Sequence, residues 1–445
     1  MGTLSLDAPA QNKRERRRAE NMIREADRAY DQKELRSAVE LYAQALTIMP
    51  NDADAHFRKG RAHFFLSEYD LAVNELEAAQ RLGYKGNEIY RIRWQAYEKE
   101  KKYNEALADL EQVLRTEPNN LAYHMAAADL YINKGEHAKA ISALEKAIAE
   151  NPKNADVYYR LAVARSRSGD LEGQAAAAEE AIKRNTQFLA DSYILLASAR
   201  HAQKRIPEAI VAYDKALASR PDKFESYRLL ADLYRSQNQI DDGIRVLEDA
   251  RRLNATNGVV YRDLSLFYGL ANKNDEAIAA GRSAAQLLPT DPVAHSNLCR
   301  AYYQARKAEL AVSACNTALR LAPEDGESLF YLGRANTELK RPADAEKFYR
   351  RAVTSLLAAT AAKPDDADAF YMLGNAYADL QQNSKAVEAY TKVLELNPKL
   401  TKAYFNIGII KIIERDKNGA MAQYNALLQN DKPLADRLKA EIDKL

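Results

Sequence analysis

The histidines and cysteines are the residues best able to do chemistry in this sequence, and they form no catalytic or metal-binding set. His56 and His63 stand seven residues apart, about 10 Å along a helix, which is too far for both rings to bind one metal ion. The sequence has no glycine-rich phosphate loop, no His-Glu-x-x-His, no Cys-x-x-Cys and no Gly-x-Ser-x-Gly motif. We therefore expect no catalytic residue, no bound metal and no other cofactor, and we predict that the protein is not an enzyme.

Acidic residues recur at a different kind of position, near the start of predicted helices. They are Asp54, Glu88, Asp156, Asp191, Glu225, Glu327 and Asp368. A carboxylate in the first turn interacts favourably with the positive end of the helix dipole. We therefore interpret these residues as helix-stabilising rather than as metal ligands.

Composition limits the partners that the chain can have. It has 445 residues, with 65 Lys and Arg against 63 Asp and Glu and a net charge of +2. This balance predicts no general affinity for nucleic acid or for an anionic membrane surface. The longest apolar runs fall short of the roughly 20 residues of a membrane span, so no membrane insertion is expected. We expect a cytoplasmic protein as the sequence stands, or a periplasmic or exported one if a signal peptide has been removed.

Pairs of short helices position the side chains of this chain, and residues 369–398 show the pattern best. The first helix has residues on one face at i, i+3, i+4 and i+7, namely Phe370, Leu373, Gly374 and Tyr377. The second helix repeats the pattern at i, i+4 and i+7 with Ala386, Tyr390 and Val393. Pro398 ends it, because proline lacks the N–H that would continue the helix. A pair this small cannot bury its own apolar face, which predicts further copies on both sides.

Copies of this pattern fill residues 19–432. The spacing from Ala26 to Gly60 is 34 residues, as is the spacing from Ala38 to Ala72. Twelve copies can be placed in one phase, with one extra residue before the sixth and seven extra residues in the tenth. The tenth copy is therefore expected to have a longer second helix, at about 342–362, which is either a contact site of its own or a tolerated extension.

Two short segments flank the repeats. Residues 1–18 form a basic polar N-terminal extension, whose run from Lys13 to Arg18 is interpreted as a solvated helical segment rather than a nucleic-acid signal. Residues 433–445 predict one more helix, with Leu434, Leu438 and Ile442 on one face. That helix would cover the exposed apolar face of the last copy, as a repeat array requires.

The pattern of aromatic residue, Leu-Gly, Tyr, then Ala, aromatic residue and Pro resembles the tetratricopeptide repeat. The resemblance implies an all-α fold, a right-handed superhelical α-solenoid of helix-turn-helix repeats that ends in the C-terminal capping helix. It also implies that Cys299 and Cys315 both face the seam between the two helices of one repeat. A disulfide is then conceivable, but we favour two buried thiols that act as core filler.

The family's ligands lie along the concave face, which is lined chiefly by residues of the first helices. Mapped onto this sequence, the inner positions give four arginines in successive repeats, Arg228, Arg262, Arg300 and Arg334. They also give the aromatic residues Tyr303, Phe330, Tyr371 and Phe405, with Asn375 beside them. Arginine binds carboxylates through two parallel hydrogen bonds, and exposed aromatic rings serve as anchors. The alternative is that neighbours such as Asp232 and Asp263 already neutralise these arginines.

The function we predict is a non-enzymatic protein-protein interaction scaffold that binds an extended, acidic peptide or partner protein in its concave groove. A second hypothesis is an exported scaffold for the assembly of envelope polysaccharide or pili. A third is a regulatory subunit of an enzyme complex. The identity of the partner and the oligomeric state stay open, because a fold does not name its partner.

Overall fold

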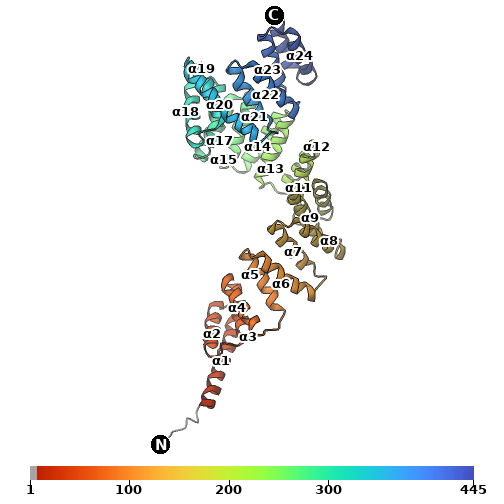
Figure 1. The fold of residues 1–445 in the computed structure, drawn as a ribbon, viewed down its shortest axis with the longest axis vertical. Coiled ribbons are helices and arrows are strands. Elements are labelled where there is room, and N and C mark those ends of the chain that lie inside the picture. Colours follow the sequence, from red (N-terminus) through yellow and green to blue (C-terminus); the bar gives the residue numbers. More distant parts are fainter. Residues whose placement is uncertain (1–7) are drawn as a thin grey trace. The chain divides into compact units, whose positions relative to one another are not determined.

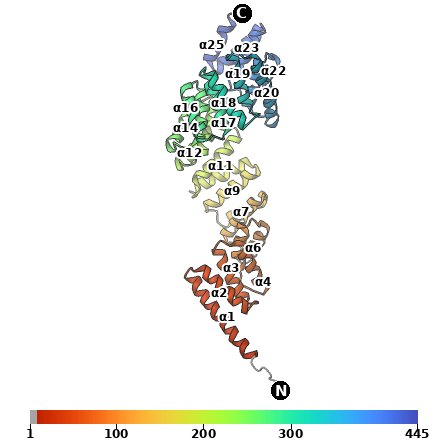
Figure 2. The ribbon, with the colours of Figure 1, turned by 90° about the vertical axis from the view of Figure 1, so that its left-hand side faces the viewer.

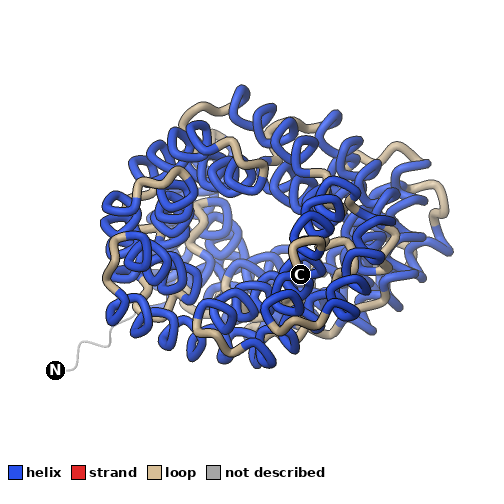
Figure 3. Tube along the Cα trace, turned by 90° about the horizontal axis from the view of Figure 1, so that it is seen from above, coloured by secondary structure: helices blue, strands red, loops and turns tan. Residues whose placement is uncertain are grey.

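The computed structural model describes residues 8–445, and its side chains from residue 13 onward. Throughout this range the chain forms α-helices joined by short turns, and no strand occurs among the described residues (Figure 3). The all-α fold predicted from the sequence is therefore confirmed.

The chain divides into two compact units, residues 1–209 (unit 1) and 210–445 (unit 2), and helix α12 (Ile206–Ser219) crosses the division. The helices of unit 1 are α1 (Ala8–Asp31), α2 (Leu35–Ile48), α3 (Ala53–Phe65), α4 (Tyr69–Arg81), α5 (Glu88–Lys99), α6 (Tyr103–Thr116), α7 (Leu121–Lys134), α8 (His137–Glu150), α9 (Ala155–Ser168), α10 (Leu171–Lys183) and α11 (Leu189–Ala202). The helices of unit 2 are α13 (Phe224–Ser236), α14 (Ile240–Leu253), α15 (Gly258–Leu270), α16 (Asn274–Leu287), α17 (Pro292–Gln304), α18 (Ala308–Leu321), α19 (Gly326–Glu338), α20 (Pro342–Ala362), α21 (Ala367–Asp379), α22 (Asn383–Leu396), α23 (Lys402–Ile413), α24 (Lys417–Asn430) and α25 (Lys432–Ile442).

Helices that follow one another in the sequence pack against one another within each unit. In unit 2, for example, α15 packs on α16, α16 on α17 and α17 on α18, so that pairs stack in chain order (Figures 1 and 2). The first helices of successive pairs also touch, as α15, α17 and α19 do. The result is an α-solenoid, in which every pair buries the apolar face that it cannot bury alone.

A left-handed residue marks the turn inside every pair. In the turns inside the pairs, positive φ angles occur at residues 33, 67, 101, 135, 169, 204, 238, 272, 306, 340, 381 and 415, and two more, at Gly83 and Asn185, lie in turns between pairs. The interval is 34 residues except for one of 35 and one of 41, which is where the sequence has its extra residues. Only Gly135 and Gly169 are glycines among these twelve, so most turns accept the cost of a left-handed non-glycine residue.

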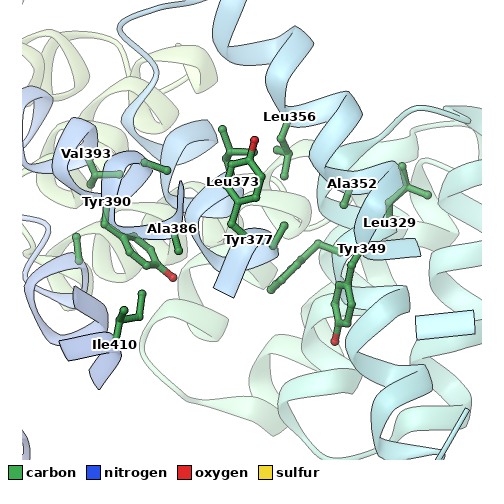
Figure 4. Packing of buried hydrophobic residues seen from close by; sticks show 14 of the residues in the cluster. Leu329, Tyr349, Ala352, Leu356, Leu373, Tyr377, Ala386, Tyr390, Val393 and Ile410 are labelled. Atoms are coloured by element: carbon green, nitrogen blue, oxygen red, sulfur yellow. The ribbon is translucent and has the colours of Figure 1, made fainter. Parts of the chain in front are cut away.

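The seam between paired helices is built as the sequence pattern predicts. In the cluster that contains α19–α23, Tyr349, Tyr377 and Tyr390 are buried among leucines and alanines (Figure 4). A Cβ atom at Gly374 would lie 2.6 Å from the Tyr390 ring, so a glycine is required for this close approach.

The extended helix α20 is part of the core for most of its length. Leu356, in the added turns, is buried and belongs to the same cluster, whereas the neighbouring Leu357 is 46% exposed. At the C-terminal end, α25 packs on α23 and α24 and buries Ala435, Leu438 and Ile442. At the N-terminal end, the basic residues 13–18 lie on α1 and are exposed. Residues 1–7 of the predicted extension lie outside the described residues.

The two cysteines differ from the expectation. Cys299 on α17 and Cys315 on α18 are joined by a disulfide, with Cα atoms 5.0 Å apart, and both are fully buried. The preference for two free thiols was therefore wrong. The seam positions bring the two Cα atoms closer than the usual distance of a disulfide, about 5.5–6 Å, but within its range.

Two kinds of feature are absent from the described residues. No helix among residues 8–445 is both long enough and apolar enough to cross a membrane. In the same range, no three His, Cys, Asp or Glu side chains are grouped so that they could hold a metal ion.

Candidate ligand-binding cavity of unit 2

A cavity of about 490 Å³ lies inside unit 2. Its walls come mainly from first helices, namely α13, α15, α17, α19, α21 and α23, with the loop 397–401 that leads into α23. First helices provide the lining because the second helix of each pair lies on the other side of the seam. We refer to this space as the unit 2 cavity.

The charged residues of the unit 2 cavity are mostly basic. Its basic residues are Arg235, Arg300, Arg334, Lys399 and Lys402, and its acidic residues are Glu327 and Asp368. The aromatic residues are Phe330, Tyr331 and Tyr371, and amides such as Asn375 and Asn406 lie between them. The lining thus combines an excess of positive charge with flat apolar surfaces.

Five of the nine groove residues predicted from the sequence line this cavity: Arg300, Arg334, Phe330, Tyr371 and Asn375. The other four, Arg228, Arg262, Tyr303 and Phe405, lie outside its lining. The Tyr303 ring packs on Tyr331, with centroids 5.6 Å apart, and the guanidinium of Arg437 lies 5.2 Å from the Phe405 ring.

All four predicted arginines are paired with carboxylates of the chain. Arg228 pairs with Glu225 and Asp232, and Arg262 pairs with Asp263 and Asp291 at 3.1 and 2.9 Å. Within the cavity, Arg300 Nη1 lies 2.9 Å from Glu327 Oε1. Arg334 donates two hydrogen bonds to Asp379. Neutralisation by neighbours, the alternative raised by the sequence, therefore applies to each of them.

Three basic residues of the cavity were missed by the sequence analysis: Arg235, Lys399 and Lys402. Arg235 and Lys402 stand at the twelfth and second positions of their repeats, which also face inward in the family, whereas the four arginines named from the sequence stand at the fifth or ninth position. Lys399 lies in the loop after Pro398 and has no periodic position. Its place in the cavity depends on how that loop folds, so no sequence signal could have found it.

Lys399 and Lys402 differ from the arginines because no carboxylate among residues 8–445 forms an ion pair with them. Lys399 Nζ donates a hydrogen bond to the Gln237 side chain. Partial desolvation lowers the pKa of Lys402, and the nearby charge of Arg300 lowers it further, although Asp431 opposes this. A bound anion would oppose both effects, because a nearby negative charge favours the charged form of a lysine.

The charged residues on the acidic side of the cavity have shifted pKa values. Burial raises the pKa of Glu327, which Arg300 opposes, and the neighbouring carboxylates Asp325 and Asp368 raise it further. Burial disfavours the charged form of Arg235, but Asp368 and Asp232 outweigh it, so the pKa of Arg235 is raised. The four side chains Arg235, Arg300, Glu327 and Asp368 therefore form one coupled cluster.

A hydrogen-bond network holds the amides of the other wall. Asn406 Nδ2 donates to Tyr371 Oη and Asn375 Oδ1, each at 3.2 Å, and Tyr390 Oη donates to Asn375 Oδ1 at 2.7 Å. Such a network fixes side chains that can hydrogen-bond a ligand.

Family models described as tetratricopeptide repeat match residues 23–91, 94–155, 125–190, 159–224 and 297–356, which together are more than half of the chain. The chain belongs to the tetratricopeptide repeat family. Two further models of the same description match residues 200–264 and 367–400 of this tetratricopeptide repeat protein. The helix pair α23/α24 and most of the pair α15/α16 lie outside the matched residues and continue the same fold.

Solved structures of low sequence identity are also similar to this tetratricopeptide repeat protein. One, titled "Structure of Naa15/Naa10 bound to HypK-THB", is 17% identical, with 92% of this chain and 68% of that chain covered and a TM-score of 0.43. The crystal structure of yeast Tom70 is 15% identical, with 95% and 99% covered and a TM-score of 0.41. No curated protein sequence matches. Similarity at this level carries no information about partners.

Proposed function

We propose that this tetratricopeptide repeat protein is a non-enzymatic interaction scaffold that holds an extended acidic segment of a partner protein in the unit 2 cavity. The observation that carries the proposal is the excess of basic over acidic residues in the lining, five against two. Tetratricopeptide repeats generally bind proteins or peptides, and the charge of the lining selects an acidic one.

Lys399 and Lys402 are the residues expected to contribute most binding energy. A ligand carboxylate beside an arginine that is already paired gains little, because the local carboxylate has cancelled most of the positive charge. Beside Lys399 or Lys402, which are exposed, it meets a positive charge that no carboxylate of the described residues has cancelled. The partly exposed rings of Tyr331 and Tyr371 offer flat surfaces for apolar side chains that alternate with the ligand's carboxylates, whereas Phe330 is only 1% exposed and belongs to the core.

The direct test is the binding of a fluorescein-labelled hexaglutamate peptide to the full chain, measured by fluorescence anisotropy, with the hexaglutamine peptide as reference. We expect the glutamate peptide to bind and the glutamine peptide not to bind. The double variant Lys399→Gln/Lys402→Gln should weaken binding at least fivefold. Raising the salt concentration should weaken it too, because surface charges are screened.

A matched control removes two exposed lysines of unit 2 that lie outside the cavity. The double variant Lys363→Gln/Lys417→Gln changes the net charge by the same amount, so its effect reports the influence of overall charge without any change in the cavity. Equal losses in the two double variants would show that the cavity is not the binding site. Equal binding of the two peptides would show that the ligand is not acidic.

The disulfide favours a second candidate, the exported scaffold. Disulfides persist in oxidising compartments and are rare in the reducing cytosol. Fractionation of cells that express the protein from its native gene, with free thiols blocked at lysis, would test this. Cytosolic protein with both thiols alkylated would contradict it.

A further inference from the structure

Two side-chain contacts join residues that are far apart in the sequence at the edge of the unit 2 cavity. Arg235, at the end of α13, forms an ion pair with Asp368 in the first turn of α21, 133 residues away. Beside it, Lys399 donates a hydrogen bond to Gln237, across 162 residues. We refer to these four side chains as the clasp.

The clasp differs from the other ion pairs of the cavity in what it connects. The pairs of Arg300 and Arg334 join a first helix to the first helix of the next pair. The clasp instead joins the pair α13/α14 to α21, with three helix pairs between them, and to the loop before α23, with four. It therefore closes unit 2 across the cavity rather than along the stack.

Asp368 is chemically a copy of the proposed ligand. It places a carboxylate on Arg235, in the same cavity and against the same coupled cluster that a glutamate or aspartate of a partner would meet. Arg235 and Asp368 are 30% and 57% exposed, so water and ligands can reach the pair. An ion pair this exposed contributes at most about 1 kcal/mol, which a competing carboxylate can replace.

We propose that Asp368 is a built-in competitor, and that an acidic segment binds the cavity by displacing Asp368 from Arg235 and opening the clasp. This inference rests on the proposed function, since it needs an acidic ligand. It assigns Arg235 as the residue that receives a ligand carboxylate and Asp368 as the residue that limits affinity. The released Lys399 then pairs with a second ligand carboxylate, so opening the clasp exposes two positive charges.

The competition is tested with the variant Asp368→Asn, which keeps the shape of the side chain and removes its charge. The hexaglutamate peptide should bind the variant at least threefold more tightly than the unmodified protein. The matched control is Asp344→Asn, which removes an exposed first-turn carboxylate from α20, outside this cavity. It should leave the affinity within the error of the measurement. Arg235→Gln should weaken binding in either background.

The clasp itself is tested without any ligand. Amide hydrogen exchange in residues 235–240 and 397–402 should become faster in Asp368→Asn than in the unmodified protein or in Asp344→Asn. When the hexaglutamate peptide is added to the unmodified protein, amide exchange in residues 235–240 should stay slow, because the bound peptide then protects the residues that the clasp protected before.

The outcomes separate the two proposals. Suppose that exchange is faster in Asp368→Asn but that the peptide binds neither the variants nor the unmodified protein. The proposals of an acidic ligand and of a competing Asp368 would then both be overturned, and the clasp would have a purely structural role. Binding of the peptide with the same affinity in Asp368→Asn as in the unmodified protein would overturn the competitor role and leave the scaffold function standing. Unchanged exchange in Asp368→Asn would overturn the clasp.

Discussion

Arg334 of α19 and Asp379 of α21 are joined by two parallel hydrogen bonds, with Nε to Oδ2 at 2.6 Å and Nη2 to Oδ1 at 3.1 Å. This geometry is the strongest way in which an arginine holds a carboxylate. It ties together two first helices and occupies the Nε–Nη2 edge of a guanidinium that the sequence analysis assigned to a ligand.

Removing the charge of Asp379 should therefore make Arg334 available to a ligand. We expect Asp379→Asn to bind the hexaglutamate peptide about threefold more tightly, since a partly exposed ion pair is worth up to about 1 kcal/mol. Fluorescence anisotropy measures this, with Asp365→Asn as the control that removes an exposed carboxylate elsewhere in unit 2. The same affinity in both variants would show that Arg334 takes no part in binding.

The carboxyl group of Asp263 should make the stability of unit 2 depend on pH. Burial raises the pKa of Asp263 to about 6, although Arg262 opposes this. A group that binds its proton more tightly in the folded state stabilises the fold most at low pH, and this contribution is lost as the pH rises from about 4 to about 6.

The variant Asp263→Asn removes this effect. Relative to the variant, the unmodified protein should lose on the order of 2 kcal/mol of unfolding free energy between pH 4 and pH 7. Thermal and urea unfolding at several pH values measures the difference, with the exposed Asp275→Asn as control. Parallel stability curves for Asp263→Asn and the unmodified protein would contradict the raised pKa.

A substitution at Gly374 tests whether the close approach of α21 and α22 requires a glycine. An added Cβ would lie 2.6 Å from the Tyr390 ring, which is buried and held by its hydrogen bond to Asn375. Gly374→Ala should therefore lower the free energy of unfolding by about 1–2 kcal/mol, because overpacking outweighs the gain of about 1 kcal/mol in helix propensity.

Gly269→Ala is the control for Gly374→Ala, because a Cβ there would lie 2.8 Å from the end of the flexible Gln304 side chain and otherwise meet only Arg300 Nε, at an ordinary contact distance of 3.7 Å. It should be neutral or stabilising in the same urea unfolding experiment. If both variants behaved alike, the glycine of the seam would not be required by packing.

The disulfide between Cys299 and Cys315 predicts that neither residue reacts with an alkylating agent in the denatured, unreduced protein. Intact mass should show two alkylations only after reduction. The two cysteines are separated by 16 residues, so replacing both with alanine should cost about 3 kcal/mol of stability. Two alkylations without reduction would restore the free thiols that the sequence favoured.

The sequence by itself determined the repeats of this protein. The spacing of residues such as Gly374 and Tyr390 fixed the helix pairs, their seam and the small residues that the seam needs, because a helix period of 3.6 residues assigns each side chain to one face. The resemblance to the tetratricopeptide repeat then indicated which residues point inward, which is why Arg300, Arg334, Phe330, Tyr371 and Asn375 could be named.

Only the tertiary structure decided which inward residues meet. The contact of Arg235 with Asp368 and the place of Lys399 depend on how each helix pair is rotated against the next, which periodicity does not encode. The same rotation sets the carboxylate that each arginine finds, as Arg334 finds Asp379. Periodicity is a local property of the chain, whereas a cavity and its charge balance result from packing accumulated over several repeats.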